Sequence, residues 1–251
     1  MPEFIVALVI FLCLVGASLG CLFLHEKLPE RYRQDETSNF VRQVTSVFVV
    51  MTSLVLGLMI NSAKTTFESI DHNVHVFATD LILLDRMLAQ YGSETSEARQ
   101  HLQAYVQRAV NRAGSDDDAG AAGDRTSERL LDEVGASLGA MKPGDTEHTQ
   151  LWRDIRQQFQ KVVEMRWTLV EQSEGTVPVP LLVMLVTWLA LIFASLGFRA
   201  PRNLVIVASL FLSAALIAGA IYLILDMDVP FAGPIQVSSA PLERVIQEMQ
   251  R

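Results

Sequence analysis

The chain has little of what most soluble enzymes and secreted domains contain. Its two cysteines, Cys13 and Cys21, lie in one apolar block, which excludes a disulfide framework for any exposed part. Charged residues make up 19% of the 251 residues, whereas half of the residues are hydrophobic. A soluble domain of this length usually carries more charge. The shortage of charge predicts that much of the chain lies in lipid.

The apolar residues are concentrated in four blocks without acidic, basic or histidine side chains: residues 4–24, 43–63, 176–198 and 203–225. A helix of this length, at about 1.5 Å per residue, crosses a hydrocarbon core of about 30 Å. We therefore predict an all-α, multi-pass membrane protein with four transmembrane helices in two hairpins, 1–63 and 176–226. A cleaved signal peptide is the alternative for the first block, but that block is too long and lacks a positively charged start.

The segment between the hairpins, residues 64–175, is predicted to be a helical domain exposed to water. Apolar residues recur there at alternating spacings of three and four from Phe67 to Tyr91, which is typical of a coiled-coil seam. No proline or glycine separates this repeat from the second block. We therefore expect one helix to run from the membrane to Tyr91 and to end at Gly92.

Three further helices are expected in this domain, with no strand-like alternation between them. One runs from Ser96 to Arg112, and a second covers residues 127–141. The third follows Pro143-Gly144-Asp145, with Thr146 as its N-cap residue. A linker at about 114–126, rich in glycine and aspartate, is expected to be flexible, and residues 227–251 form a C-terminal tail.

The second block carries a stripe of small and polar residues. At about 100° per residue, it comprises Ser46, Val50, Ser53, Gly57, Asn61 and Lys64. Such a stripe either packs against other helices or lines a water-filled path, and the spacing leaves both open. Small residues four positions apart also predict close helix packing at Gly16 and Gly20 in the first block and at Ala215 and Gly219 in the fourth.

Other motifs lack the context that their chemistry requires. Gly16–Gly20 and Gly135–Gly139 match the nucleophile pattern G-x-S-x-G, but neither follows a predicted strand. Asp71, His72 and His75 have ligand-like spacing, yet a solvated helix face is the simpler interpretation. No phosphate-binding loop is present. We therefore predict no enzyme activity, no metal or other cofactor, and no nucleic-acid partner.

Two regions resemble a known family. The second block contains Leu54-Val55-Leu56-Gly57-Leu58-Met59-Ile60-Asn61-Ser62-Ala63. The last third contains Pro201, Arg202, Asn203, Asp226, Pro230, Phe231 and Gly233, followed by Val237-Ser238-Ser239. Together these residues resemble the bestrophin-like family of integral membrane proteins and, more distantly, the bestrophin anion channels. The resemblance covers both hairpins and the start of the long helix, and it fails over the linker 114–145.

The resemblance implies a homo-oligomeric, pentameric ion channel in the cell membrane, because bestrophins are pentamers whose second helix lines the pore. The stripe would then face permeant inorganic ions, and Lys64 slightly favours anions. The acidic calcium-binding run and the aromatic constriction of bestrophins are absent here. Bestrophins keep the middle domain in the cytosol, whereas basic residues in the short loops favour an exported domain. The alternative function is a non-conducting scaffold or sensor that oligomerises through its helical domain.

Overall fold

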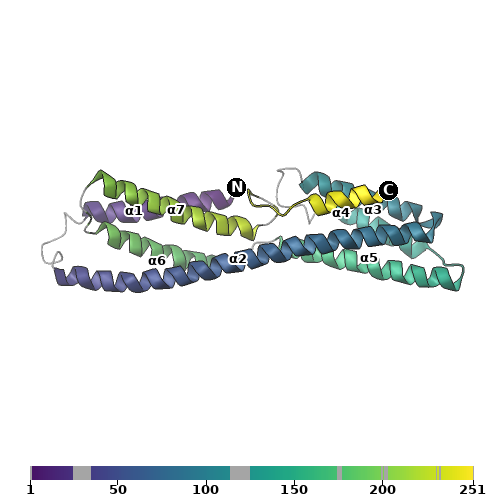
Figure 1. The fold of residues 1–251 in the computed structure, drawn as a ribbon, viewed down its shortest axis with the longest axis horizontal. Helices are drawn as coiled ribbons and strands as arrows, with labels where there is room; N and C mark the ends of the chain where they lie inside the picture. The colour runs from purple at the N-terminus through teal and green to yellow at the C-terminus, as the bar shows by residue number, and fades with distance from the viewer. Residues whose placement is uncertain are drawn as a thin grey trace. The chain divides into compact units, whose positions relative to one another are not determined.

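The computed structural model describes residues 2–24, 35–113, 125–173, 177–198, 200, 203–229, 231 and 233–250. These residues form helices and short connections, with four helices long and apolar enough to cross a membrane. The chain divides into two compact units (Figure 1). Unit 1 comprises Met1–Thr65 and Thr176–Asp228, and unit 2 comprises Thr66–Gly175 and Val229–Arg251. The predicted all-α fold is thereby confirmed, and the structure has four candidate membrane-spanning helices, the number predicted from the sequence.

Unit 1 contains the apolar helices. They are α1 (Pro2–Leu24), the first part of α2 (Asp35–Tyr91), α6 (Val179–Gly197) and α7 (Leu204–Asp228). α1 packs against both α6 and α7. The core of the unit includes Leu14 of α1, Met59 of α2, Phe193 of α6 and Ile221 of α7. The pairing of these helices into two hairpins stays a prediction.

The ends of α6 and α7 follow from local chemistry. Pro178 precedes α6, and its carbonyl oxygen accepts hydrogen bonds from the backbone N–H groups of Leu181 and Leu182 at 3.0 and 3.3 Å. Asn203 precedes α7, and its side-chain oxygen accepts from the Val205 N–H at 3.4 Å. An asparagine at this position satisfies a donor that the helix itself leaves unpaired.

Close contact between α1 and α6 depends on Gly197. A Cβ atom placed on Gly197 would overlap the backbone carbonyl of Ser18 in α1. In contrast, the small residues singled out from spacing are exposed in the chain: Gly16, Gly20, Ala215 and Gly219. A Cβ placed on any of these three glycines would meet no atom within 4 Å. Their proposed role in helix packing therefore stays a prediction for contacts with other molecules.

α2 is one continuous helix of 57 residues. In unit 1 its buried residues include Thr52, Met59 and Ala63, which are seven and four positions apart. In unit 2 they recur at spacings of three and four, at Ile70, Val74, Phe77, Leu81, Leu84, Leu88 and Tyr91. Gly92 follows with a φ of 114°, which a residue with a Cβ rarely adopts. The predicted helix through Tyr91 and its end at Gly92 are confirmed.

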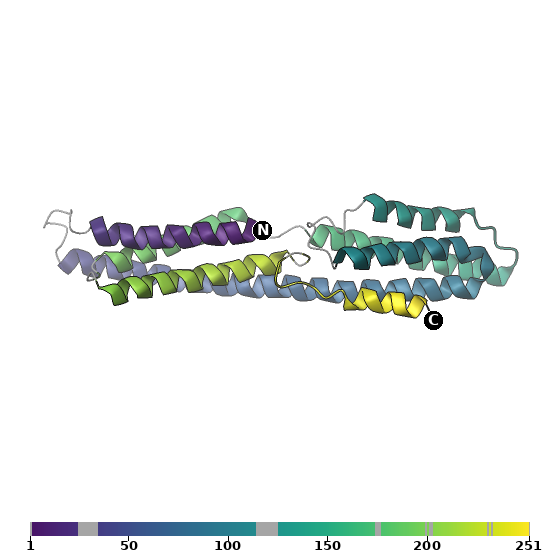
Figure 2. The ribbon, with the colours of Figure 1, turned by 90° about the horizontal axis from the view of Figure 1, so that it is seen from above.

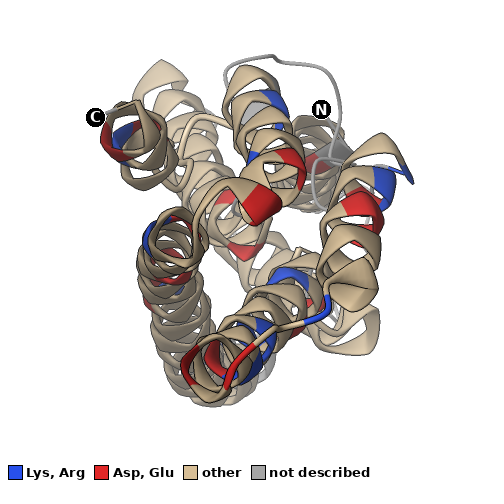
Figure 3. Ribbon diagram, turned by 90° about the vertical axis from the view of Figure 1, so that its right-hand side faces the viewer, with Lys and Arg blue, Asp and Glu red and all other residues tan. Residues whose placement is uncertain are grey.

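Unit 2 is a helical bundle around the second part of α2. Its other elements are η3 (Ser93–Thr95), α3 (Ser96–Ala113), α4 (Arg125–Ala140), α5 (Thr146–Gln172) and α8 (Ala240–Met249). Figure 2 shows α8 beside α2, where Arg86 donates a hydrogen bond of 3.0 Å to Glu248. In the end-on view of Figure 3, acidic and basic residues occur on several helices and do not gather on one of them.

One expectation for unit 2 needs correction. The N-cap of α5 is Asp145 and not Thr146, because the Asp145 carboxylate accepts the His148 backbone N–H at 2.7 Å. The C-terminal region 227–251 contains a helix that the sequence did not predict, α8, whose Val245 and Met249 are buried in the core of unit 2. The expected linker at 114–126 falls largely on residues 114–124, which lie outside the described ranges.

Candidate functional site

The stripe predicted on the second span lies on an exposed face of α2. All of its residues are exposed in the chain: Ser46, Val50, Ser53, Gly57, Asn61 and Lys64. A Cβ atom added to Gly57 would meet no atom within 4 Å. Packing within the chain therefore does not use the stripe, and the face is left for lipid, water or another protein molecule.

The opposite face of α2 packs on the rest of unit 1. The Phe48 ring lies 6.4 Å from the Trp188 ring of α6, measured between centroids. The Thr45 hydroxyl donates to the Ser195 hydroxyl of α6 at 2.9 Å, and Met59 is buried. These contacts fix which side of α2 points away from unit 1, and that side carries the stripe.

The stripe is bordered by exposed apolar side chains. Val47, Leu54 and Leu58 on one flank are 54–65% exposed, and Val49 and Ile60 on the other are 44% and 50% exposed. Apolar flanks suit contact with lipid or with neighbouring helices. A narrow polar strip between them is the pattern expected where several helices surround a water-filled path.

The polar groups of the stripe differ in how they are satisfied. The Ser46 hydroxyl donates to the Gln43 carbonyl at 2.7 Å, and the Ser53 hydroxyl donates to the Val49 carbonyl at 2.8 Å. Serines bonded in this way are tolerated in lipid. Asn61 carries a carboxamide and Lys64 an ammonium group at the end of the stripe. A carboxamide is costly to leave in hydrocarbon, so Asn61 favours contact with water or with another subunit.

Beyond the span, the same face of α2 becomes charged through Glu68, Asp71 and His75. The His75 ring nitrogen Nδ1 lies 3.0 Å from the Asp71 carbonyl oxygen and 3.9 Å from its carboxylate. Across the part of the chain that the structure describes, no three His, Cys, Asp or Glu side chains come together in a way that could hold a metal ion.

Two carboxylates at the end of α7 are buried. Asp226 and Asp228 are 2% and 5% exposed. Asp228 accepts a hydrogen bond of 3.0 Å from the backbone N–H of Val177, just before α6. Asp228 also lines a cavity of about 210 Å³ together with Ser62 of α2. The Asp228 carboxylate thus connects the end of α7 to the residue that leads into α6.

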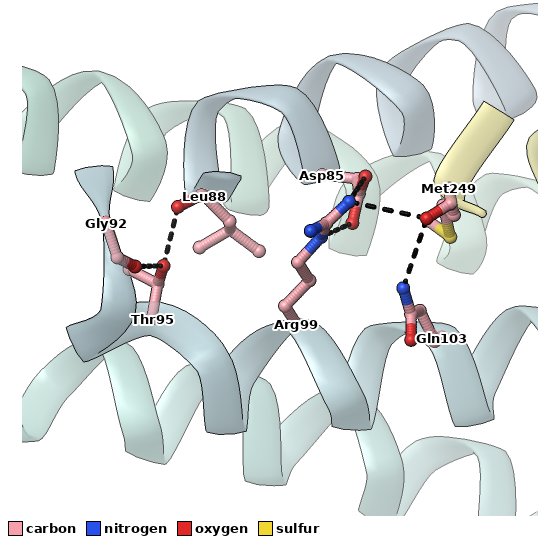
Figure 4. A network of polar contacts seen from close by, with 7 residues as sticks. All are labelled: Asp85, Leu88, Gly92, Thr95, Arg99, Gln103 and Met249. Carbon is pink, nitrogen blue, oxygen red and sulfur yellow. Dashed lines mark hydrogen bonds and ion pairs between the residues drawn. The ribbon is translucent and has the colours of Figure 1, made fainter. Parts of the chain in front are cut away.

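A polar network in unit 2 was not foreseen from the sequence (Figure 4). The buried Asp85 of α2 accepts two hydrogen bonds from Arg99 of α3, at 2.6 and 2.9 Å. Arg99 and Gln103 also donate to the Met249 carbonyl at the end of α8, at 3.3 and 3.4 Å. The pKa of Arg99 is raised, mainly by its hydrogen bond to Asp85. The available sequence signal was the charged pair Asp85 and Arg86, which interrupts the otherwise apolar run 81–88.

The motif residues of the last third have separate structural roles. Asn203 caps α7, Asp226 is buried, and Phe231 packs against the core of unit 2. Gly233 has a φ of 96°, a conformation that favours glycine. The remaining motif residues, Pro201, Arg202 and Pro230, lie outside the described ranges.

Comparison with known proteins places the chain in a family. A family model named Bestrophin-like domain matches residues 12–242, which include most of both units. No curated protein matches the chain. The match and the four helices that are long and apolar enough to span a bilayer make this a multi-pass membrane protein. The chain belongs to the bestrophin-like family.

Proposed function

We propose that this protein is a homo-oligomeric ion channel of the cell membrane whose pore is lined by the exposed stripe of α2. One observation carries the proposal: every residue of the stripe is exposed, whereas the opposite face of the same helix packs on unit 1, where Thr52 and Met59 are buried. A stripe of this kind on one chain cannot enclose water. Several copies around an axis can, and the resemblance to bestrophins makes five the expected number.

In such a ring, each residue of the stripe would be repeated once per subunit. Ser46 and Ser53 would supply hydroxyl oxygens that can accept, because their protons are used within the helix. Asn61 would supply carboxamides, and Gly57 would leave room for a wide path. The Lys64 ring of positive charge would favour anions over cations. The bestrophin-like family is associated with channels and not with enzymes, which supports the same conclusion.

Reconstitution of the purified full-length chain in planar bilayers tests this proposal. We expect currents with a modest preference for anions, and we expect Lys64→Glu to move the reversal potential in a salt gradient toward the cation value. Lys161→Glu is the matched control, since Lys161 is an exposed lysine on α5 and is not part of the stripe on α2. Both variants change the net charge equally.

Three results would count against a pore lined by this stripe. One is a folded oligomer that passes no current at any voltage or with any ion, which would favour the non-conducting scaffold or sensor. A second is an equal shift of the reversal potential by both variants. The third is a dimer without a central water path.

A further inference from the structure

Unit 2 contains a cavity of about 100 Å³ that the proposed pore does not involve. It lies between α2, α3, α4, α5 and the segment that leads into α8. Most of the wall is apolar and includes Phe77 of α2, Leu169 of α5 and Phe231 of the segment before α8. The residues concerned all belong to unit 2.

The polar part of the wall is built around a buried arginine. Arg166 of α5 is 5% exposed and lines the cavity. Tyr105, which is itself 5% exposed, lies near Arg166, and the guanidinium carbon of Arg166 lies 5.2 Å from the centre of the Trp167 ring. The buried Ser127 of α4 also lines the cavity. A permanent positive charge and two hydroxyls are therefore placed at one apolar cavity.

Tyr105 is held in the form that can donate a hydrogen bond. Burial raises the pKa of Tyr105 to about 12, and the nearby Arg166 only partly opposes this effect. The hydroxyl therefore keeps its proton at neutral pH. Ser238, on the segment that leads into α8, accepts the Ala240 backbone N–H at 3.2 Å, so its own proton is available to a ligand.

The chemistry of the wall specifies the ligand. None of the described lining residues is acidic, and a guanidinium group binds a carboxylate through two parallel hydrogen bonds. The apolar side of the cavity suits a short alkyl group and gives an inorganic anion nothing to bind. Since a cavity of about 150 Å³ holds benzene, a space of about 100 Å³ fits a molecule the size of acetate or propionate.

We propose that unit 2 binds a short-chain monocarboxylate in this cavity, with the carboxylate on Arg166 and the alkyl group against Phe77, Leu169 and Phe231. Hydrogen bonds from Tyr105 and Ser238 complete the site. The assignment rests on unit 2 alone and is independent of ion conduction.

Binding is measured on the purified full-length chain in detergent, by thermal unfolding and by titration calorimetry. Propionate is the ligand probe, propionamide is its neutral counterpart of the same shape, and chloride serves as the inorganic anion, all at one ionic strength. We expect propionate to bind saturably and to raise the unfolding temperature, because a ligand that binds only the folded state stabilises it. Propionamide and chloride should do neither.

Two variants test the location of the site. Arg166→Met keeps much of the side-chain volume but removes the charge, and we expect at least a tenfold loss of propionate affinity, about 1.4 kcal/mol. Arg153→Met, at an exposed position of the same helix, is the control and should bind as the wild type does. Ala109→Leu leaves Arg166 in place but fills the cavity that Ala109 lines, and it should abolish binding.

Circular dichroism shows whether each variant retains the helical fold. If Arg166→Met fails to fold, Ala109→Leu decides the location alone. The proposal is overturned if propionamide stabilises the protein as strongly as propionate does, or if chloride displaces propionate. It is also overturned if propionate does not bind the wild type, or if a folded Ala109→Leu variant keeps the wild-type affinity.

Discussion

Gly197 sets how closely α1 and α6 approach, because its hydrogen atom occupies a place where any side chain would meet the backbone of Ser18. A backbone carbonyl within a helix cannot move aside as the end of a flexible side chain can. Gly57, on the stripe, is a glycine of a different kind, since a Cβ there would meet nothing within 4 Å of the chain. Both glycines follow a leucine in an apolar helix, but only at Gly197 would a side chain collide with a neighbouring helix.

We expect Gly197→Ala to destabilise unit 1 by about 1–3 kcal/mol, the usual cost of overpacking a core. Thermal unfolding in detergent measures the effect. Gly139→Ala on α4 is the control, because Gly139 is an exposed helical position with open space around it, and it should stay within about 0.5 kcal/mol of the wild type. Equal stability of the two variants would show that α1 and α6 do not meet at Gly197.

Single residues also show where sequence reasoning reaches its limit. Asp145 and Thr146 are adjacent, and both residue types cap helices. The backbone decides between them, since Asp145 is extended, with φ −141° and ψ 177°, and its carboxylate reaches the His148 N–H. The sequence identified where α5 begins, but not the residue that caps it, because that choice depends on dihedral angles that no residue type determines.

At the scale of single helices, the start of α5 depends on pH through Asp145. Hydrogen bonds from the His148 backbone and side chain lower the pKa of Asp145. A carboxylate with a lowered pKa stabilises the folded state above its unfolded pKa of about 3.9 and loses that effect as pH falls through the folded value. The cap is therefore fully effective at neutral pH.

We expect Asp145→Ala to lower the unfolding temperature at pH 7, and we expect the difference from the wild type to shrink below about pH 4. Asp154→Ala is the control, since Asp154 is an exposed residue inside α5. Thermal unfolding at a series of pH values measures the difference. A difference that is the same at pH 3 and pH 7 would rule out the carboxylate cap.

α8 shows why a short helix escapes prediction from sequence. It has ten residues, and its buried side chains are Pro241, Val245 and Met249. A run this short gives a weak periodic signal, and its partners lie far away in sequence, on α2 and α3. The long seam of α2 was predictable because it repeats over many turns.

Docking of α8 is expected to depend on the network of Asp85 and Arg99. Asp85→Asn removes the charge that orients Arg99 toward the Met249 carbonyl, and a hydrogen bond to a charged group is worth about 1.5–3 kcal/mol. Hydrogen exchange followed by mass spectrometry should show faster exchange in Ala240–Met249. Asp132→Asn, at an exposed position of α4, should leave that exchange unchanged. Unchanged exchange in Asp85→Asn would mean that apolar packing alone holds α8.

For the whole molecule, composition and periodicity were sufficient to predict an all-α chain with four apolar helices. A helix satisfies its own backbone hydrogen bonds, and apolar side chains make it stable in lipid. The same periodicity identified the face of α2 that the structure leaves exposed. What covers that face could not be predicted from one chain, since it depends on other copies of the protein. The cavity of unit 2 joins residues far apart in sequence and had no sequence pattern. The charge at Asp85 inside an apolar run marked the polar network, but its partners Arg99 and Met249 could not be predicted from the sequence.

The most direct test of the central claim is the reaction of cysteines placed along α2 with a charged, water-soluble thiol reagent, in reconstituted protein whose Cys13 and Cys21 are replaced by alanine. Cysteines at Ser46, Val50, Ser53 and Asn61 should react, because they face a central water path. Cysteines at Leu54 and Leu58, on the apolar flank, should remain unreacted. Reaction of both sets alike, or of the flank alone, would contradict a pore lined by this face of α2.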